Sequence, residues 1–320
     1  MRRFPPPINL MTSLKNYKKH TIGIAVSIIF VAFVEYYVGW TKLLSPWQNQ
    51  SWGTILSVIV LLLISYLLRA LRLYDYFKQE MRGHFLLTCR LMLQHNFFNN
   101  MLPMRTGEAS FPILIRRYFC IPMSHSIPAL LWFRMLDAHT LLMFAAMALM
   151  IIWQDTWPTS LCLVLLATWL TVPYLVYVHK QRFFSYLYSY FPKHRQPLLD
   201  KIQLGLPQTK VAFWRAWLWT VANWSIKISS FAYILTLFGP IPGLPAVLGA
   251  ITGDASSILP WHGVAGAGTF EAGVLVGLLP FDIDSQTGLS VAINLHIIIL
   301  GTTIIGGILS VLIPTKLPHG

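Results

Sequence analysis

The sequence predicts an all-α membrane protein, a polytopic helix bundle with six membrane spans and two re-entrant helical hairpins. Composition is the first observation: the 320 residues are 55% hydrophobic and only 11% charged, whereas a soluble domain carries about 25% charged residues. The second is a mean hydropathy of +0.59, concentrated in apolar segments of membrane-spanning length. The third is that charged segments broken by proline and glycine interrupt this apolar sequence at two places.

Six apolar segments are predicted to cross the membrane. They are residues 22–38, 52–68, 127–153, 160–178, 212–238 and 289–313. The first is long for the apolar part of a cleaved signal peptide, and no small-x-small cleavage site follows it, so we expect a membrane anchor. Twelve Trp and 13 Tyr suit aromatic belts at the two membrane surfaces.

One membrane domain accounts for almost the whole chain. We place it at residues 21–313, after a basic cytoplasmic segment at 1–20 and before a cytoplasmic tail at 314–320. A basic cytoplasmic loop is predicted inside the domain at residues 179–211, where prolines prevent one continuous helix. Cys89, Cys120 and Cys162 show neither metal-ligand spacing nor a disulfide framework, and we expect them to pack as small apolar residues.

Two segments are too short, or too broken, to be ordinary spans. In the first, a helix at residues 84–102 runs into the break that contains Pro103 and Gly107, and basic residues return too soon for another crossing. In the second, the short apolar segments 244–259 and 268–279 flank another Pro/Gly-rich break. Irregular backbone at membrane depth is tolerated only when it is buried in protein or lines a wet cavity. We therefore expect the two breaks to face each other across a substrate pathway.

The basic residues agree with this topology. All 24 Lys and Arg except Lys42, Arg134 and Lys227 fall on one side of the predicted membrane, as the positive-inside rule requires when both termini are cytoplasmic. The arrangement span, hairpin, span then occurs twice with opposite orientation. Inverted repeats with broken helices are typical of transporters, and this pattern predicts such a repeat here.

Six charged residues are expected within the spans or at the breaks, namely Glu108, Arg134, Asp137, Lys227, Asp254 and Glu271. Each would cost about 2.5–3.5 kcal/mol at a helix centre unless it is paired or hydrated. A structural ion pair between Arg134 and Asp137, three residues apart on one helix, is one explanation. A polar cavity explains all six together.

We expect these residues, with Asn99 and Arg105, to bind a substrate. Arg105 and Arg134 suit a phosphate group, with Lys227 a weaker candidate. Asp137, Asp254 and the two glutamates would face a cationic or polar headgroup, or a coupling proton. Glu108 and Glu271 also suit helix capping, and the sequence leaves both roles open.

No enzyme class has a strong signature in this sequence. We find no nucleophile elbow, phosphate-binding loop, dinucleotide fingerprint or zinc-binding helix, and we expect neither a cofactor nor a metal. Asp282-Ile283-Asp284 matches the Asp-x-Asp pattern of membrane transferases that act on lipid-linked substrates, which is the alternative function. His139, His262 and His296 show no ligand spacing, so packing or wet-cavity roles are expected rather than metal or proton sites.

The motif residues resemble the lysyl-phosphatidylglycerol synthase transmembrane region family, the flippase-like domains found alone or fused to an aminoacyl-lipid synthase. The matching residues are Asn99 or Asn100, Pro103, Gly107-Glu108, Arg134, Asp137 and the segment 260–271. The resemblance covers residues 22–313 and implies the flippase part alone, without lipid synthesis. Phe133 stands where the family often has Glu, and Arg116 comes late after Gly-Glu, so the headgroup can differ from the aminoacylated lipid.

The function expected from the sequence is therefore movement of a phospholipid or polyprenyl-phosphate-type lipid between the leaflets of a bacterial inner membrane. The expected partners are membrane lipids and the anionic leaflet surface, with a second copy of the chain or a separate lipid-modifying enzyme as a protein partner. Nucleic acid is not expected, because the charge of +13 is spread over one membrane face.

Overall fold

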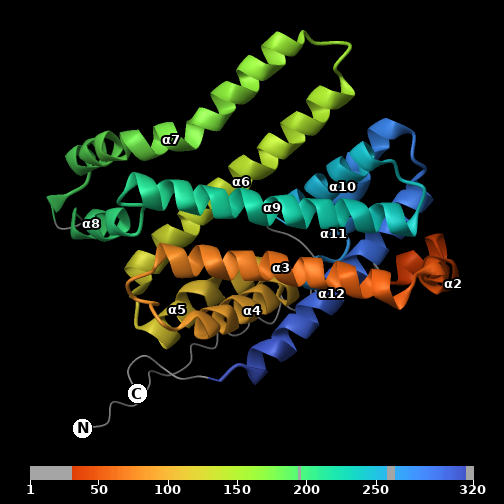
Figure 1. Cartoon of the computed structure of the whole chain (residues 1–320), viewed down its shortest axis with the longest axis horizontal. Coiled ribbons are helices and arrows are strands. Elements are labelled where there is room, and N and C mark those ends of the chain that lie inside the picture. Colours follow the sequence, from red (N-terminus) through yellow and green to blue (C-terminus); the bar gives the residue numbers. More distant parts are fainter. Residues whose placement is uncertain (1–30, 194–195, 258–263, 315–320) are drawn as a thin grey trace.

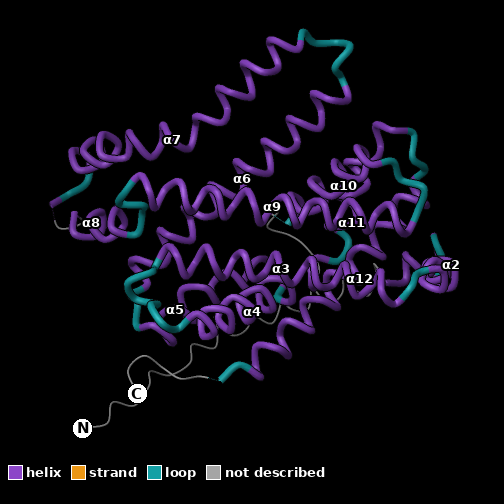
Figure 2. Tube along the Cα trace, viewed as in Figure 1, coloured by secondary structure: helices purple, strands orange, loops and turns teal. Residues whose placement is uncertain are grey.

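The computed structural model describes residues 31–193, 196–257 and 264–314, with the backbone alone for residues 103–105 and 264. Over this part of the chain the regular structure is helical, as Figure 2 shows. Within these described ranges, five helices are long and apolar enough to cross a membrane: α3 (Trp52–Tyr76), α6 (Met123–Ile152), α7 (Thr159–Tyr190), α9 (Lys210–Phe238) and α12 (Ser285–Leu312). The integral membrane character predicted from composition is confirmed.

These helices correspond to five of the six predicted spans. The sixth predicted span, residues 22–38, lies mostly outside the described residues. Its described part is helical at residues 31–37. The short helices α2 (Trp40–Leu44) and η1 (Ser45–Asn49) connect this region to α3. Ser51 caps α3, because its Oγ accepts a hydrogen bond of 3.0 Å from the Thr54 backbone N–H.

Two groups of short helices stand between the long ones. We call α4 (Phe85–Met101), η2 (Pro103–Ala109) and α5 (Ser110–Phe119) the first hairpin. The second hairpin consists of α10 (Gly243–Ser256), η4 (Val264–Gly266) and α11 (Thr269–Leu278), and η5 (Leu279–Phe281) follows it. In Figure 1 the hairpins lie toward opposite ends of the neighbouring helices α3 and α9. The helix break of the first hairpin is η2 and that of the second is η4, and the two breaks are in contact with each other.

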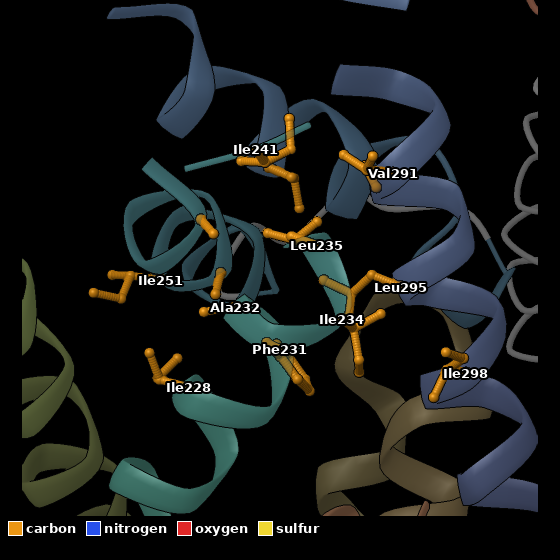
Figure 3. Close-up of a cluster of buried hydrophobic side chains, with 14 of the residues drawn as sticks. Ile228, Phe231, Ala232, Ile234, Leu235, Ile241, Ile251, Val291, Leu295 and Ile298 are labelled. Carbon is orange, nitrogen blue, oxygen red and sulfur yellow. The ribbon is translucent and has the colours of Figure 1, made fainter. Parts of the chain in front are cut away.

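Three hydrophobic cores form among the described residues: one lies around each hairpin, and a smaller one joins residues 34–43 to α12. One core contains buried residues of α9, α10, α11 and α12, including the ten that Figure 3 labels. The core around the first hairpin joins the C-terminal half of α3 to α4, α5 and the first half of α6. Helices α3 and α9 take part in both of these cores, and the stretch of each helix between its two apolar patches carries polar side chains. Ser65 on α3 donates a 2.9 Å hydrogen bond to Asn223 on α9 in this polar stretch.

Small residues let the two helices of the second hairpin pack closely. Gly249 and Gly253 are four residues apart on α10, and Gly273 and Gly277 have the same spacing on α11. A Cβ atom on Gly277 would lie 2.7 Å from the backbone O of Leu248. This small-xxx-small pattern allows close backbone approach in membrane helix pairs, which explains how two helices too short to span can form a compact unit.

Helix α3 is longer than the span predicted from the sequence. The predicted span ended at residue 68, and Arg69 and Arg72 were assigned to a cytoplasmic connection. In the structure α3 continues to Tyr76, and Arg72 is buried within it. Arginine is a good helix former, and its charge is stabilised by the partners described below.

The predicted loop at 179–211 is also more helical than expected. Helix α7 continues to Tyr190, α8 (Gln196–Leu204) follows, and α9 begins at Lys210. The prolines do separate these helices, as predicted, and Pro197 lies in the first turn of α8, where a missing N–H is tolerated. Together with α6, α7 extends away from α9 at the top of Figure 1.

Candidate functional site

A cavity of about 130 Å³ lies where the two hairpin breaks approach α3, α6, α9 and α12. A buried water needs about 10–15 Å³ of such space, so the cavity has room for a small hydrated group rather than for acyl chains. Its polar lining comes from both halves of the chain. The polar and charged side chains are Ser65, Tyr66, Arg69, Asn99, Asn100, Glu108, Arg134, Lys227, Asp254, Ser256, Ser257, Thr269 and His296.

Asp137 on α6 is the centre of a buried network beside the cavity. The guanidinium of Arg72 spans both carboxylate oxygens, with Nη1 at 2.7 Å from Oδ1 and Nη2 at 3.4 Å from Oδ2. Trp224 Nε1 donates to Oδ1 over 3.0 Å, and Arg72 also donates to Thr220 over 2.8 Å. Helices α3, α6 and α9 are thereby joined by charge-assisted hydrogen bonds.

Arg134 connects this network to the first hairpin. Its Nη2 lies 3.1 Å from Glu108 Oε1, and its Nη1 lies 3.7 Å from Asp137 Oδ2. The predicted pair between Arg134 and Asp137 is therefore present, but it is the longer of these two contacts. The break after α4 places a carboxylate against α6, so Glu108 fastens the hairpin to the bundle.

A second ion pair lines the cavity on the side of the second hairpin. Lys227 on α9 contacts Asp254 on α10, and both side chains are about 15% exposed. The ammonium group also lies 4.8 Å from the ring centroid of Trp224 and 5.2 Å from that of Phe231. Cation–π contacts of this kind stabilise a desolvated ammonium, and they hold Lys227 at the cavity wall.

Glu271 is tied to both α11 and α12. Its Oε2 accepts a 2.8 Å hydrogen bond from the Gly268 backbone N–H, which caps α11 as one of the two predicted roles requires. Its Oε1 lies 2.5 Å from His296 Nδ1 on α12. His296 Nε2 lies 2.9 Å from the backbone O of Ala265 in η4. The residues of the second break are thus held against α12.

Arg69 differs from the other cations of the cavity. Among the described residues it has no carboxylate within ion-pair distance, and its hydrogen-bond acceptor is Asn96 Oδ1 at 3.2 Å. Arg134 and Lys227, by contrast, each contact a carboxylate. A guanidinium at a cavity wall with donors to spare is suited to a phosphate oxygen.

The predicted site residues are largely brought together, although with unequal access to the cavity. Asn99, Glu108, Arg134, Lys227 and Asp254 line it. Asp137 and Glu271 are buried behind its wall at 7% and 2% exposure. The side chain of Arg105 lies outside the described part of the structure.

Sequence reasoning did not select Arg69, Arg72 or His296 for this site. The first two were assigned to a loop because the predicted span ended before them. A longer helix could have been found from the uninterrupted run of helix-forming residues up to Tyr76. No local pattern distinguishes His296, whose partner Glu271 is 25 residues earlier in the chain.

One residue of the Asp-x-Asp match, Asp284, has a structural role. Asp284 is the N-cap of α12, and its Oδ1 accepts the backbone N–H groups of Gln286 at 2.9 Å and Thr287 at 3.0 Å. Hydrogen bonding by Thr287, with a smaller contribution from Gln286, holds the pKa of this carboxyl below its ordinary value. Within the described residues no group of three or more His, Cys, Asp or Glu side chains is placed to hold a metal ion.

Comparison with known protein families gives a match that extends over most of the chain. The model of the lysylphosphatidylglycerol synthase TM region matches residues 21–307. No curated protein sequence matches the chain. The matched range includes both hairpins, the long helices α3, α6, α7 and α9, α12 as far as residue 307, and every residue that lines the cavity. The chain therefore belongs to the lysylphosphatidylglycerol synthase TM region family, a family of membrane domains associated with flippase-like function.

Proposed function

We propose that this protein is a lipid translocase that moves a phospholipid or polyprenyl-phosphate-type lipid between the two leaflets. The observation that carries the proposal is the contact between the two helix breaks, η2 and η4, beside a cavity lined by charges from both halves of the chain. Acyl or prenyl chains would stay in the bilayer while the headgroup passes through the cavity. Membership of the family supports this class of activity.

The charges of the cavity favour an anionic headgroup. Glu108 compensates Arg134 and Asp254 compensates Lys227, so these pairs contribute little net charge. Arg69 adds one positive charge that has no carboxylate within ion-pair distance among the described residues. A phosphate group in the cavity would supply that charge and accept hydrogen bonds from Arg69, with Asn99 and Asn100 as further donors. Arg105 remains a predicted second phosphate ligand.

Replacing Arg69 with glutamine is expected to slow translocation of a phosphate-bearing lipid at least about tenfold. A hydrogen bond to a charged group contributes about 1.5–3 kcal/mol, and about 1.4 kcal/mol corresponds to a factor of ten. Glutamine can still donate to Asn96, so the fold is expected to persist. The measurement is the exchange of a fluorescent phospholipid between leaflets in proteoliposomes.

Arg215→Gln is the matched control, because Arg215 pairs with Asp75 away from the cavity. It removes the same type of charge, and its translocation rate is expected to stay close to that of the wild type. Equal rates for both variants and the wild type would refute the role of Arg69 in binding the headgroup.

We further propose that the two hairpins are re-entrant and enter the membrane from opposite faces, as an inverted repeat. Their helices support this, since α5 and α11 have 10 residues and α10 has 14, against about 20 for a span. Each hairpin also follows one long helix and precedes another. Arg116 and Arg117 lie in the last turn of α5, and Lys193, Arg195 and Lys201 lie in or next to α8 in the sequence. These basic residues favour a cytoplasmic face at that end of the bundle, with both chain termini there and an inner-membrane location.

Cysteine labelling at Thr106 and Ala267 is expected to report opposite sides of the membrane. The two positions lie in or next to the two breaks, and the native cysteines would first be replaced by serine. A membrane-impermeant maleimide should reach Thr106→Cys from the cytoplasmic side and Ala267→Cys from the outer side. Labelling of both positions from one side would refute the inverted arrangement.

A further inference from the structure

His296 contacts Glu271 through one ring nitrogen and Ala265 through the other, and the two contacts together require a proton that cannot leave without breaking one of them. His296 Nε2 lies 2.9 Å from the carbonyl oxygen of Ala265. A carbonyl oxygen is an acceptor, so Nε2 carries the hydrogen. Nδ1 lies 2.5 Å from Glu271 Oε1. This contact is a hydrogen bond only if a second hydrogen lies between the two atoms, bound either to Nδ1 or to the Glu271 carboxyl. The pair shares one proton in either case.

We propose that Glu271 and His296 together form the binding site for a coupling proton. This inference rests on the proposed lipid translocation and specifies its energy source. When the shared proton leaves, an O–H or N–H bond breaks, the proton passes to water, and the pair changes from neutral to a charge of −1. The neutral imidazole keeps one N–H and can then satisfy only one of its two neighbours. With the hydrogen on Nε2, the lone pair of Nδ1 faces the Glu271 carboxylate, and with the hydrogen on Nδ1, the lone pair of Nε2 faces the carbonyl oxygen of Ala265. One of the two contacts becomes repulsive in either case.

Loss of the proton would release the second break from α12. The chain around this break is attached through Glu271, which accepts from Gly268, and through Ala265, which accepts from His296. Ala265, Gly266 and His296 all line the cavity, so water there has access to the imidazole. Protonation therefore decides whether the break keeps both attachments to α12. The sequence predicts a packing or wet-cavity role for His296 rather than a proton site.

The same proton affects headgroup binding. The deprotonated pair places a negative charge beside the same cavity that Arg69 lines, and that charge opposes an anionic phosphate. The protonated pair does not. Binding of the proton and binding of the phosphate therefore favour each other, and by linkage the effect is reciprocal. The expected coupling is symport, in which proton and anionic lipid move in the same direction.

Other charged or titratable groups face this cavity, and they must be considered with the pair. They are Tyr66 and Arg69 on α3, Glu108 in η2, Arg134 on α6, Lys227 on α9 and Asp254 on α10. Glu108 and Asp254 already face a cation each. Glu271 differs from them, because its ion-pair partner among the described residues is a histidine. Histidine is the side chain that ordinarily titrates near neutral pH.

Glu271→Gln is the informative variant, because it mimics the protonated pair. The glutamine carbonyl oxygen can accept from Gly268, and its amide N–H can donate to His296 Nδ1, so both bonds persist without a proton to lose. The first measurement is the thermal unfolding midpoint in detergent from about pH 5 to about pH 9, the range in which histidine commonly titrates. The wild-type midpoint is expected to fall with rising pH by more than that of Glu271→Gln, because alkali removes the proton that stabilises the folded state.

The second measurement is lipid translocation in proteoliposomes with and without a pH gradient. The wild type and His139→Gln are expected to respond to the gradient, whereas Glu271→Gln is expected to lose the response. His139 is a matched control, because it stacks on Trp169 at 5.2 Å and does not line the cavity.

The two measurements separate the possible failures. If the wild type moves no lipid at any pH, the proposed function is refuted, and the unfolding profiles still decide the proton site. Equal pH dependence of unfolding in wild type and Glu271→Gln would overturn the proton site, as would a Glu271→Gln protein that does not fold. A gradient response retained by Glu271→Gln would overturn the coupling.

Discussion

Arg72→Met is expected to lower the free energy of unfolding by about 3–5 kcal/mol, the cost of leaving one member of a buried ion pair without its partner. Asp137 is 7% exposed and Arg72 6%, so water cannot replace the lost guanidinium. Arg134 is a poor substitute, since its Nη1 lies 3.7 Å from Asp137 and its Nη2 is engaged by Glu108. The measurement is reversible unfolding by denaturant in detergent micelles.

Arg215→Met is the control for this experiment. Arg215 pairs with Asp75, whose side chain is 11% exposed, but the Arg215 side chain itself is 46% exposed. Water already reaches this ion pair through Arg215, so a smaller loss than for Arg72→Met is expected. Equal destabilisation by the two substitutions would contradict the account of Arg72 and Asp137 as the buried link between α3 and α6.

Gly107→Ala is expected to abolish most translocation and to destabilise the first hairpin. An added Cβ would lie 2.1 Å from the backbone O of Phe98 and 2.5 Å from the Cα of Asn99. Both are backbone atoms of α4, so η2 must move away from this helix to relieve the clash. Such overpacking typically costs about 1–3 kcal/mol. The movement would also carry Glu108 away from Arg134, and the assay is lipid exchange in proteoliposomes together with the unfolding midpoint.

Gly301→Ala provides the comparison within α12. Nothing lies within 4 Å of a Cβ built on Gly301, so the same change of residue type should leave exchange and stability near the wild-type values. Wild-type exchange by Gly107→Ala would show that close contact between η2 and α4 is not required.

Much of the architecture could be predicted from the sequence, because membrane helices obey a strong local rule. A backbone in lipid must satisfy its own hydrogen bonds, so the long apolar segments could be identified as α3, α6, α7, α9 and α12. The Pro103 and Gly107 break, and the one before Glu271, were found for the same reason. Both are proline- or glycine-rich interruptions of apolar sequence.

The partners of the charged residues could not be predicted in the same way. Arg72 and Asp137 are 65 residues apart in sequence, and Glu271 and His296 are 25 apart. Their pairing depends on how the helices pack, which periodicity does not encode. Only the pair of Arg134 with Asp137, three residues apart, follows from helix geometry. The predicted end of the second span placed Arg69 outside the membrane, so its position at the cavity wall came from the structure alone.

Lipid exchange by the wild-type protein is the measurement that tests the central claim most directly. Proteoliposomes would carry a phospholipid with a fluorescent label near its headgroup. A membrane-impermeant reductant, which quenches the label in the outer leaflet, would be added outside. The account predicts that the protein makes the label of both leaflets accessible to the reductant, whereas protein-free liposomes lose the outer-leaflet signal alone. Folded wild-type protein that gives the protein-free result, with phospholipid and polyprenyl-phosphate probes and with or without a pH gradient, would contradict it.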